Sequence, residues 1–580
     1  MNDEGTAEAG TAPEAPEGGR SGSGPSLTAQ TVRGFAWAFT GTVGQALLQV
    51  VSMVVLSRLL TPNESGMATA AMLVVGFSQL VSQIGVGPAL VQRRTLDDRE
   101  VAAAFYCSLV FSVLLAVLLA VFTPYVNLVV GLPADSILLR LLTVALVLVS
   151  LSAVPMGLLQ RDLRFRAMAL VDFLAFGPAT IGTSITLAAL GYGAISVIWG
   201  QIAGAIVTAT GYHLLARPPM RLESPAAMWR AVRPLLGFGS GYSLSQVGNW
   251  FALNADNLVV TNTLGTWSLG IYGRAYQLLS QPANIIGSAV DKALFPAMAK
   301  VRDDGERLRG AYVRAASLIA LATVPTSAAL AVLAPEVIRL LLGDQWLAVI
   351  VPLQVFAVVL LPRASYKISG SLTRATGAVF AGAWRQWLYA GEVLGGCAVG
   401  AWWGVNGVAV GASVAIVLHF FVMLRFSARV APGLMRDVLR MYVKHLPIAA
   451  VSYGTAQVVA LAVRPTGSII LTMVLTLVAW ALGTALALML LRGWFRDELD
   501  VVLHLVRPGS GGGPGDTSSE SASGDSASGE AQSHEPFLSP ETRPTTIPDR
   551  PAVPPAGARI PSPPGARNSR TSMPGPRHRT

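Results

Sequence analysis

Apolar segments long enough to cross a membrane recur along most of the chain, and they limit its fold more than any other feature. A bilayer core about 30 Å thick requires roughly 20 apolar residues in a helix. Only 13% of the 580 residues are charged, about half the share of a soluble domain. We therefore predict an all-α integral membrane protein with about fourteen transmembrane helices. These spans are expected at 35–57, 67–91, 101–123, 137–159, 167–189, 193–215, 236–262, 269–295, 314–342, 347–373, 382–403, 405–427, 445–463 and 467–491.

Basic residues gather in every second loop between these segments. Arg93, Arg94 and Arg161 belong to the basic set, whereas the opposite set is nearly empty, with Arg58 and Arg464 as its clearest members. Because Lys and Arg accumulate on the cytoplasmic side of membrane proteins, both termini are predicted to be cytoplasmic. The net charge of +10 follows from these loops, so we expect no nucleic-acid partner.

One apolar segment carries a polar stripe at helical spacing. Its polar residues are Arg274, Gln277, Gln281, Asn284, Ser288 and Asp291. Steps of three and four residues place all six on one helical face, and the stripe is about 25 Å long at roughly 1.5 Å per residue. A polar face inside a bilayer needs a water-filled cavity or a polar neighbour. The stripe therefore predicts a passage through which a solute moves.

An internal repeat appears at an offset of 204 residues. Val55, Leu60 and Gly66 match Val259, Leu264 and Gly270. Just upstream, the polar positions 42, 45, 49 and 52 correspond to 246, 249, 253 and 256, of which three are polar. The repeat predicts two parallel halves related by an axis along the membrane normal, with a pathway between them.

The chain is expected to divide into six parts. They are a disordered cytoplasmic N-terminus (1–32), an N-terminal six-helix bundle (33–216), a cytoplasmic linker (217–235), a C-terminal six-helix bundle (236–430), two additional helices with an amphipathic end (431–507) and a disordered cytoplasmic tail (508–580). The tail is rich in Gly and Ser and then in Pro and Arg, a composition that cannot bury a core. It is read as a passive solvated segment or as a basic segment attracted to anionic lipids.

Several short motifs within residues 32–430 carry a family resemblance. They are LSRLLTPNESGM at 56–67, QIGVGPALVQRRTL at 83–96, LLQRDLRFRA at 158–167, ADNLVVTNTLGTWSLGIYGRAYQ at 255–277, KALFPAMAKVRDDGERLRGAYV at 292–313 and LLGDQWLAVIVPLQ at 341–354. With these motifs the chain resembles bacterial polysaccharide flippases, the Wzx-type and teichuronic-acid-exporter-like members of the MOP (multidrug, oligosaccharidyl-lipid, polysaccharide) superfamily.

The resemblance implies two pseudo-symmetric six-helix bundles around a central cavity, with two extra C-terminal helices. It implies a multi-pass protein of the bacterial plasma membrane that is not an enzyme. Such a protein moves polyprenyl-diphosphate-linked oligosaccharide from the inner to the outer leaflet by alternating access, for export of cell-surface polysaccharide. Its expected partners are that lipid, the membrane lipids, a polysaccharide polymerase and glycosyltransferases.

Two other functions remain open from the residues alone. One is a cation-coupled exporter of drugs or metabolites on the same fold, which predicts a narrower and more aromatic cavity. The other is a membrane polysaccharide polymerase or glycosyltransferase. A polymerase needs a sizeable outer loop and a glycosyltransferase needs a nucleotide-sugar domain, and the short loops between the spans leave room for neither.

The candidate substrate site combines fixed cations with amide side chains. An unpaired diphosphate is costly in the membrane, so we expect Arg274, Arg363 and Lys367 to bind it, since Arg supplies a planar fork and Lys a point charge. In the alternative interpretation, Arg274 extends to the lipid headgroups. If the helix ends at Pro362, Arg363 and Lys367 lie in a loop. Amide side chains can donate and accept hydrogen bonds with sugar hydroxyls. The alternative is that they join neighbouring helices by hydrogen bonds. The amide candidates are Gln45, Gln49, Asn249, Gln277, Gln281 and Asn284.

Asp256 and Asp291 are the candidates for coupling transport to an ion gradient. A carboxylate inside the membrane can take up H⁺ or Na⁺. The alternatives are a structural pair for Asp256 and an interfacial position for Asp291. We expect no other cofactor, and the two cysteines, Cys107 and Cys397, lack the spacing of a metal site.

Overall fold

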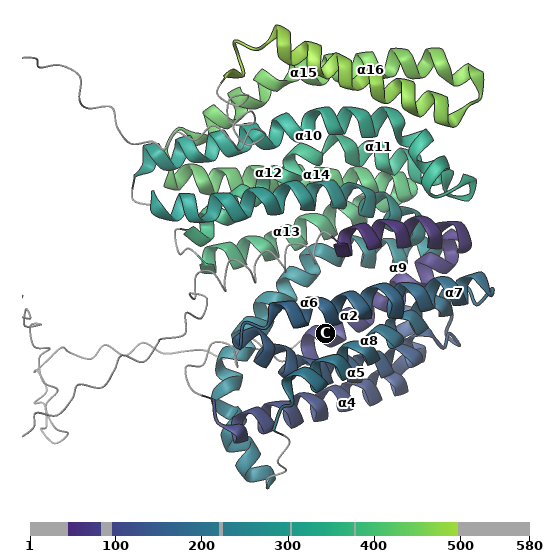
Figure 1. Ribbon diagram of the computed structural model, residues 1–580, viewed down its shortest axis with the longest axis vertical. Coiled ribbons are helices and arrows are strands. Elements are labelled where there is room, and N and C mark those ends of the chain that lie inside the picture. Colours follow the sequence, from purple (N-terminus) through teal and green to yellow (C-terminus); the bar gives the residue numbers. More distant parts are fainter. Residues whose placement is uncertain (1–43, 83–95, 220–223, 302–303, 376–378, 497–580) are drawn as a thin grey trace, which may run out of the picture. The chain divides into compact units, whose positions relative to one another are not determined.

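The computed structural model describes residues 44–82, 96–219, 224–301, 304–375 and 379–496, with the side chains of 225, 227, 229, 231–245, 285–297, 299 and 374–383 left out (Figure 1). All regular structure in these ranges is helical, and no strand occurs there. The α-helices are an N-terminal helix (Gly44–Leu59), α2 (Pro62–Ser82), α4 (Asp98–Val129), α5 (Leu138–Arg161), α6 (Phe165–Leu174), α7 (Thr183–Ala189), α8 (Ala194–Ala216), α9 (Pro225–Lys300), α10 (Gly305–Leu341), α11 (Ile350–Val358), α12 (Leu360–Ala375), α13 (Val379–Gly400), α14 (Gly404–Val430), α15 (Leu434–Val463) and α16 (Ile469–Leu490).

Nine helical stretches in the described part of the chain are long and apolar enough to span a membrane. A tenth is counted if Asp344–Val358 and Leu360–Thr373, which meet at a 49° bend, form one span. The expected all-α, multi-pass membrane fold is confirmed, whereas the number of fourteen spans stays a prediction. The domain boundaries also stay predictions, and segments 1–32 and 508–580 lie outside the described residues.

Two predicted spans, 236–262 and 269–295, both fall within α9, which consists of two helices that meet at Gly265. Gly265 interrupts the helical backbone between them, with φ of 80° and ψ of 178°. A positive φ of this kind is readily adopted only by glycine. The chain therefore turns at the position where the sequence indicated a break, and the hydrogen bond from Tyr272 Oη to Asp256 Oδ2 at 2.8 Å joins the two helices beside the turn.

The predicted span 167–189 is also irregular. It consists of α6, the π-helical segment η1 (Ala175–Gly182) and α7. Pro178 lies inside η1, and because proline has no backbone N–H to donate, the regular i to i+4 pattern cannot pass through it. The wider π turn lets the helix continue across the membrane.

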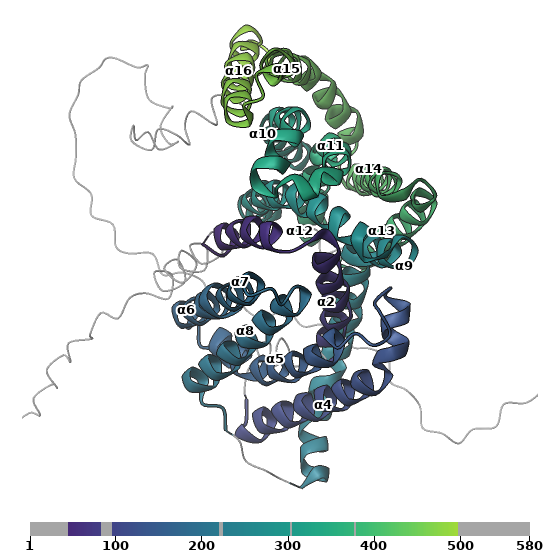
Figure 2. The ribbon, with the colours of Figure 1, turned by 90° about the vertical axis from the view of Figure 1, so that its right-hand side faces the viewer.

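Close glycine contacts hold α13 against α14. A Cβ atom added to Gly396 would lie 2.6 Å from the carbonyl oxygen of Gly411, and one added to Gly411 would lie 2.0 Å from that of Gly396. Helices in lipid lack a hydrophobic force between them and gain stability when small residues let their backbones approach. The two helices lie side by side in the C-terminal part of the molecule (Figure 2).

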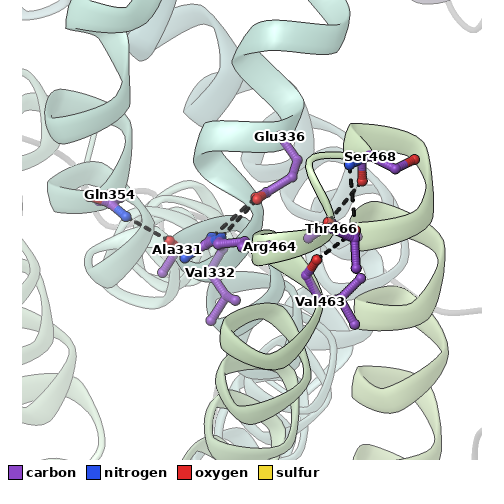
Figure 3. A network of polar contacts seen from close by, with 9 residues as sticks. Ala331, Val332, Glu336, Gln354, Val463, Arg464, Thr466 and Ser468 are labelled. Carbon is purple, nitrogen blue, oxygen red and sulfur yellow. Dashed lines mark hydrogen bonds and ion pairs between the residues drawn. The ribbon is translucent and has the colours of Figure 1, made fainter.

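A partly buried ion pair attaches the α15–α16 hairpin to α10. Arg464, in the turn between α15 and α16, donates from Nε to Glu336 Oε1 at 2.8 Å and from Nη2 to Oε2 at 3.2 Å (Figure 3). Nη2 also donates to the carbonyl oxygen of Val332 at 2.8 Å. Arg464 is one of two arginines on the loop set that is otherwise nearly free of basic residues. Its charge is neutralised by Glu336, which explains the exception.

Candidate functional site

A polar cavity of about 500 Å³ lies among the N-terminal helix, α2, α9 and α12. Six of the nine side chains predicted to bind substrate line it, namely Gln49, Arg274, Gln277, Gln281, Asn284 and Arg363. Ser65, Thr69, Asn257 and Ser280 add further hydrogen-bonding groups. The polar stripe of α9 therefore forms one wall of a cavity, and residues more than 200 positions away in sequence form another.

Arg274 points into this cavity from α9. It donates from Nη1 to Gln277 Oε1 at 3.0 Å and from Nη2 to Ser65 Oγ at 3.1 Å. Its guanidinium carbon lies 5.5 Å from the centre of the Trp346 ring, within range of a cation–π contact. The buried Nε atom has no hydrogen-bond acceptor among the described residues. Arg274 thus presents a charge with neutral partners and does not extend towards the headgroups.

Arg363 is the second cation of the cavity and is only 4% exposed. Its Nη1 donates to Tyr389 Oη at 2.8 Å, and its Nη2 donates to Tyr276 Oη at 2.6 Å. The guanidinium carbon also lies 5.3 Å from the Tyr276 ring centre. Of the residues that the structure describes, no carboxylate lies within ion-pair distance of either arginine of the cavity. Two tyrosines from different helices therefore fix the orientation of this guanidinium group.

Lys367 lies one turn after Arg363 on α12. The helix starts at Leu360 and continues past Pro362, because a proline in the first helical turn removes an N–H that has no partner there. Lys367 Nζ donates to Asn284 Oδ1 at 2.8 Å. It is not among the residues that line the cavity, and it reaches the cavity through Asn284.

The amide candidates divide into two groups. Gln281 Nε2 donates to Gln49 Oε1 at 3.0 Å across the cavity, joining α9 to the N-terminal helix. Asn249 is placed elsewhere, because its Oδ1 accepts from Gln386 Nε2 of α13 at 3.3 Å. Gln45 is exposed on the N-terminal helix and does not line the cavity.

Asp256 is buried beside the cavity and is fully engaged in hydrogen bonds. Its Oδ2 accepts from Tyr272 Oη at 2.8 Å, and its Oδ1 accepts from the Asn257 backbone N–H at 2.8 Å. This arrangement suits a structural carboxylate as well as one that exchanges a cation. The side chain of Asp291, the other candidate for ion coupling, lies outside the described residues.

The aromatic residues around Arg363 were missed by the sequence analysis. Tyr272 and Tyr276 stack at 6.0 Å between ring centres. Tyr389 lies 4.2 Å from His419, whose Nδ1 is 3.4 Å from Glu392 Oε2. The i, i+4 spacing of the first two tyrosines on either side of Arg274 was the available signal, but tyrosines at such spacing also fit an ordinary core.

Near one end of the cavity, two glycines make a reciprocal backbone crossing of α2 with α9. A Cβ atom added to Gly66 would lie 1.7 Å from the carbonyl oxygen of Thr266, and one added to Gly270 would lie 2.0 Å from that of Pro62. Both pairs are related by the offset of 204 residues that the sequence repeat shows. The repeat is therefore expressed as a local two-fold relation between equivalent backbones.

Side chains from the two halves close the same end of the molecule. Thr261 Oγ1 and Asn262 Nδ2 of α9 donate to the carbonyl oxygens of Val130 and Val129 at the end of α4, each at 2.6 Å. The last carbonyls of a helix lack partners within the helix. The two side chains of α9 therefore cap the C-terminal end of α4.

Of the equivalent residues of the N-terminal helix, Arg58 makes the contact that corresponds to Asn262, whereas Ser57 takes part through its carbonyl oxygen and not its hydroxyl. Ser57 and Arg58 precede Thr261 and Asn262 by the repeat offset. The carbonyl oxygen of Ser57 accepts from Trp346 Nε1 at 2.6 Å, and Arg58 donates to the carbonyl oxygen of Leu340 at the end of α10. This contact also explains the second arginine on the loop set that is otherwise nearly free of basic residues.

A multi-span helical protein with a polar cavity between repeated segments defines a membrane transporter. The chain belongs to a family described as polysaccharide biosynthesis proteins, whose model matches residues 55–351. The teichuronic acid biosynthesis protein TuaB of Bacillus subtilis is 26% identical over 61% of this chain and 73% of its own length. The lipopolysaccharide biosynthesis protein WzxC of Escherichia coli is 24% identical over 60% and 71%.

Solved structures agree on the fold. The lipid II flippase MurJ in an inward closed conformation matches with a TM-score of 0.62 at 14% identity, covering 81% of this chain and 99% of that one. An inward-facing MATE family transporter of the MOP superfamily matches with a TM-score of 0.53 at 19% identity, covering 68% and 96%. The family resemblance, the fold class and the assignment as a transporter instead of an enzyme are confirmed.

Proposed function

We propose that this protein moves polyprenyl-diphosphate-linked oligosaccharide from the inner to the outer leaflet of the bacterial cell membrane. The observation that carries the proposal is one cavity holding two arginines with neutral partners next to a row of amides. The names of TuaB, WzxC and the succinoglycan biosynthesis transport protein ExoT of Rhizobium meliloti support a polysaccharide role. The fold of MurJ, named a lipid II flippase, supports the lipid-linked form of the substrate.

The cavity supplies what each part of such a lipid requires. Arg274 and Arg363 face the diphosphate, because planar guanidinium groups bind phosphate oxygens in pairs. Gln49 and Gln281 now bond to each other and would exchange that bond for sugar hydroxyls. The prenyl chain stays in the lipid, where burial costs nothing.

Alternating access follows from the repeat. Closure at the end formed by Ser57, Thr261 and Trp346 rests on hydrogen bonds between side chains and helix-end carbonyls. Such contacts can break and re-form without unfolding either half. We place this end at the outer face and both termini in the cytoplasm, in line with the distribution of basic loops.

Coupling to H⁺ or Na⁺ is part of the proposal through Asp256. Release of the Tyr272 hydroxyl from Asp256 would free the carboxylate near Arg363 to bind H⁺ or Na⁺, and the loss of its negative charge would bias the cavity. A polymerase and glycosyltransferases are proposed as the enzymes that consume and supply the lipid-linked substrate.

The drug-exporter alternative fits the cavity poorly. Its described lining includes a single aromatic residue, Tyr276, and two guanidinium groups. Cationic drugs would be repelled by those charges, and apolar ones would have to displace water from amides. An anionic, hydroxyl-rich substrate suits the same surface.

The proposal is tested by depleting the protein in its host and locating the lipid-linked precursor. We expect the precursor to accumulate on the cytoplasmic leaflet after depletion. Expression of the wild-type protein should restore its normal distribution, whereas expression of Arg274→Gln or Arg363→Gln should not. Arg314→Gln is the matched control, because Arg314 is exposed on α10 and does not line the cavity. Unchanged precursor distribution on depletion would refute the function, whereas full restoration by both cavity variants would refute the site alone.

A further inference from the structure

A second cavity, separate from the polar one, lies between α10, α15 and the residues after α16. It has a volume of about 960 Å³. Most of its lining comes from α15, and Val313 of α10 and Trp494 complete it. None of these residues lines the polar cavity.

The lining carries positive charge at one end. Arg440 and Lys444 lie one turn apart on α15 and therefore share a face. The carboxylate of Asp437 is engaged by Arg309 of α10, so it does not cancel these charges. Lys444 Nζ lies 4.5 Å from the centre of the Phe495 ring, within range of a cation–π contact.

The rest of the lining is apolar and open to the surroundings. Val443, Leu446 and Trp494 are 63%, 60% and 58% exposed. In a membrane helix such residues face acyl chains, and tryptophan favours the interface between headgroups and hydrocarbon. From Arg440 to Ala450 the helix rises roughly 15 Å at 1.5 Å per residue, which is about half the hydrocarbon thickness of a bilayer.

We propose that this cavity binds an anionic phospholipid of the surrounding membrane. The phosphate lies at Arg440 and Lys444, and an acyl chain lies along Val443, Leu446 and Ala450. Charge complementarity selects an anionic head, and the apolar wall beside it selects a molecule with a long chain over free phosphate. Because α15 forms most of the site and α10 and Trp494 complete it, the lipid also bridges the α15–α16 hairpin to α10.

The test measures phospholipid retained by the full-length purified protein. Protein in nanodiscs with equal amounts of phosphatidylglycerol and phosphatidylcholine is released into detergent, and bound lipid is counted by native mass spectrometry. We expect wild type to retain phosphatidylglycerol selectively. Removal of two interfacial charges in Arg440→Gln/Lys444→Gln should weaken retention about 10- to 30-fold. Arg436→Gln is the matched control, since Arg436 is exposed on the same helix and does not line the cavity.

A photo-crosslinking residue at Leu446 identifies the occupant. Crosslinking to phosphatidylglycerol, lost in the double variant, supports the proposal. Crosslinking to residues 497–580 of the same chain, or to a polyprenyl-linked lipid, overturns it. Equal loss of lipid in Arg436→Gln overturns it as well, because the effect is then one of general surface charge. If the wild-type protein retains as much phosphatidylcholine as phosphatidylglycerol, or if soluble glycerol phosphate displaces the bound phosphatidylglycerol, the cavity is not a specific site for an anionic phospholipid.

Discussion

The close backbone contact of α2 with α9 at Gly66 and Gly270 predicts what holds the closed end of the cavity together. In Gly66→Ala and Gly270→Ala, the new methyl groups would lie 1.7 and 2.0 Å from backbone carbonyl oxygens. Ordinary contact needs roughly 3.5 Å, so α2 and α9 must separate by more than about 1 Å. Overpacking of this kind costs about 1–3 kcal/mol. We expect each variant to disfavour the closed end roughly 5- to 150-fold, because the clash is relieved when the halves part.

The assay follows access to the cavity from each side of the membrane. A Ser280→Cys thiol lines the cavity, and a membrane-impermeant thiol reagent is added to one face of the membrane at a time. Labelling from the face that carries the 59–62 and 261–266 segments should increase in both glycine variants. Protein without the introduced thiol corrects for the native cysteines.

Gly391→Ala is the matched control, since a Cβ atom at Gly391 of α13 meets nothing within 4 Å. Its labelling should equal that of the unsubstituted protein. If Gly66→Ala and Gly270→Ala are labelled no faster than Gly391→Ala while remaining folded, the crossing does not hold the closed end together. The same conclusion follows if only one of the two glycines matters, because the pseudo-symmetric contacts are equivalent.

Three further substitutions test the buried polar contacts. Tyr276→Phe removes one hydrogen bond from Arg363 and keeps the aromatic ring. Because loss of this hydrogen bond costs roughly 1–2 kcal/mol, transport, measured as precursor exported per unit of protein, should fall about 10-fold. Asp256→Asn keeps the shape but not the charge, and transport should lose its dependence on an imposed ion gradient; retention of that dependence would exclude Asp256 from coupling. Arg464→Gln leaves Glu336 buried without its partner, which should destabilise the protein by about 2–4 kcal/mol, read as a lower Tm; a Tm within experimental error of wild type would contradict the role of the pair.

The positions of the helices and the polar face of α9 could be predicted, because both depend on the spacing of apolar and polar residues within one segment. A long apolar segment must be helical in lipid, and polar residues at steps of three and four must share a face. Spacing alone therefore places Arg274, Gln277, Gln281 and Asn284 on one wall, where the cavity has them. The break between the spans 236–262 and 269–295 was also predicted, but its form was not: one glycine with positive φ makes the turn between the two helices of α9.

Contacts between helices far apart in sequence could not be predicted. Tyr389 reaches Arg363 from α13, and Gln386 engages Asn249 from the same helix. Nothing in the local pattern distinguishes these residues from lipid-facing or core positions. The repeat was more informative than its few identities suggested, because Gly66 and Gly270 proved to be in contact with equivalent backbones.

Transport in a purified system tests the central claim most directly. Vesicles containing polyprenyl-diphosphate-linked oligosaccharide in both leaflets are treated from outside with an enzyme that cleaves the sugar. Without a flippase about half of the lipid should react, since the inner leaflet is protected by the charge of the diphosphate. With the wild-type protein we predict that nearly all of it reacts, and that Arg274→Gln/Arg363→Gln returns the fraction towards one half. Protection of the inner leaflet by wild type as complete as in empty vesicles would contradict the account.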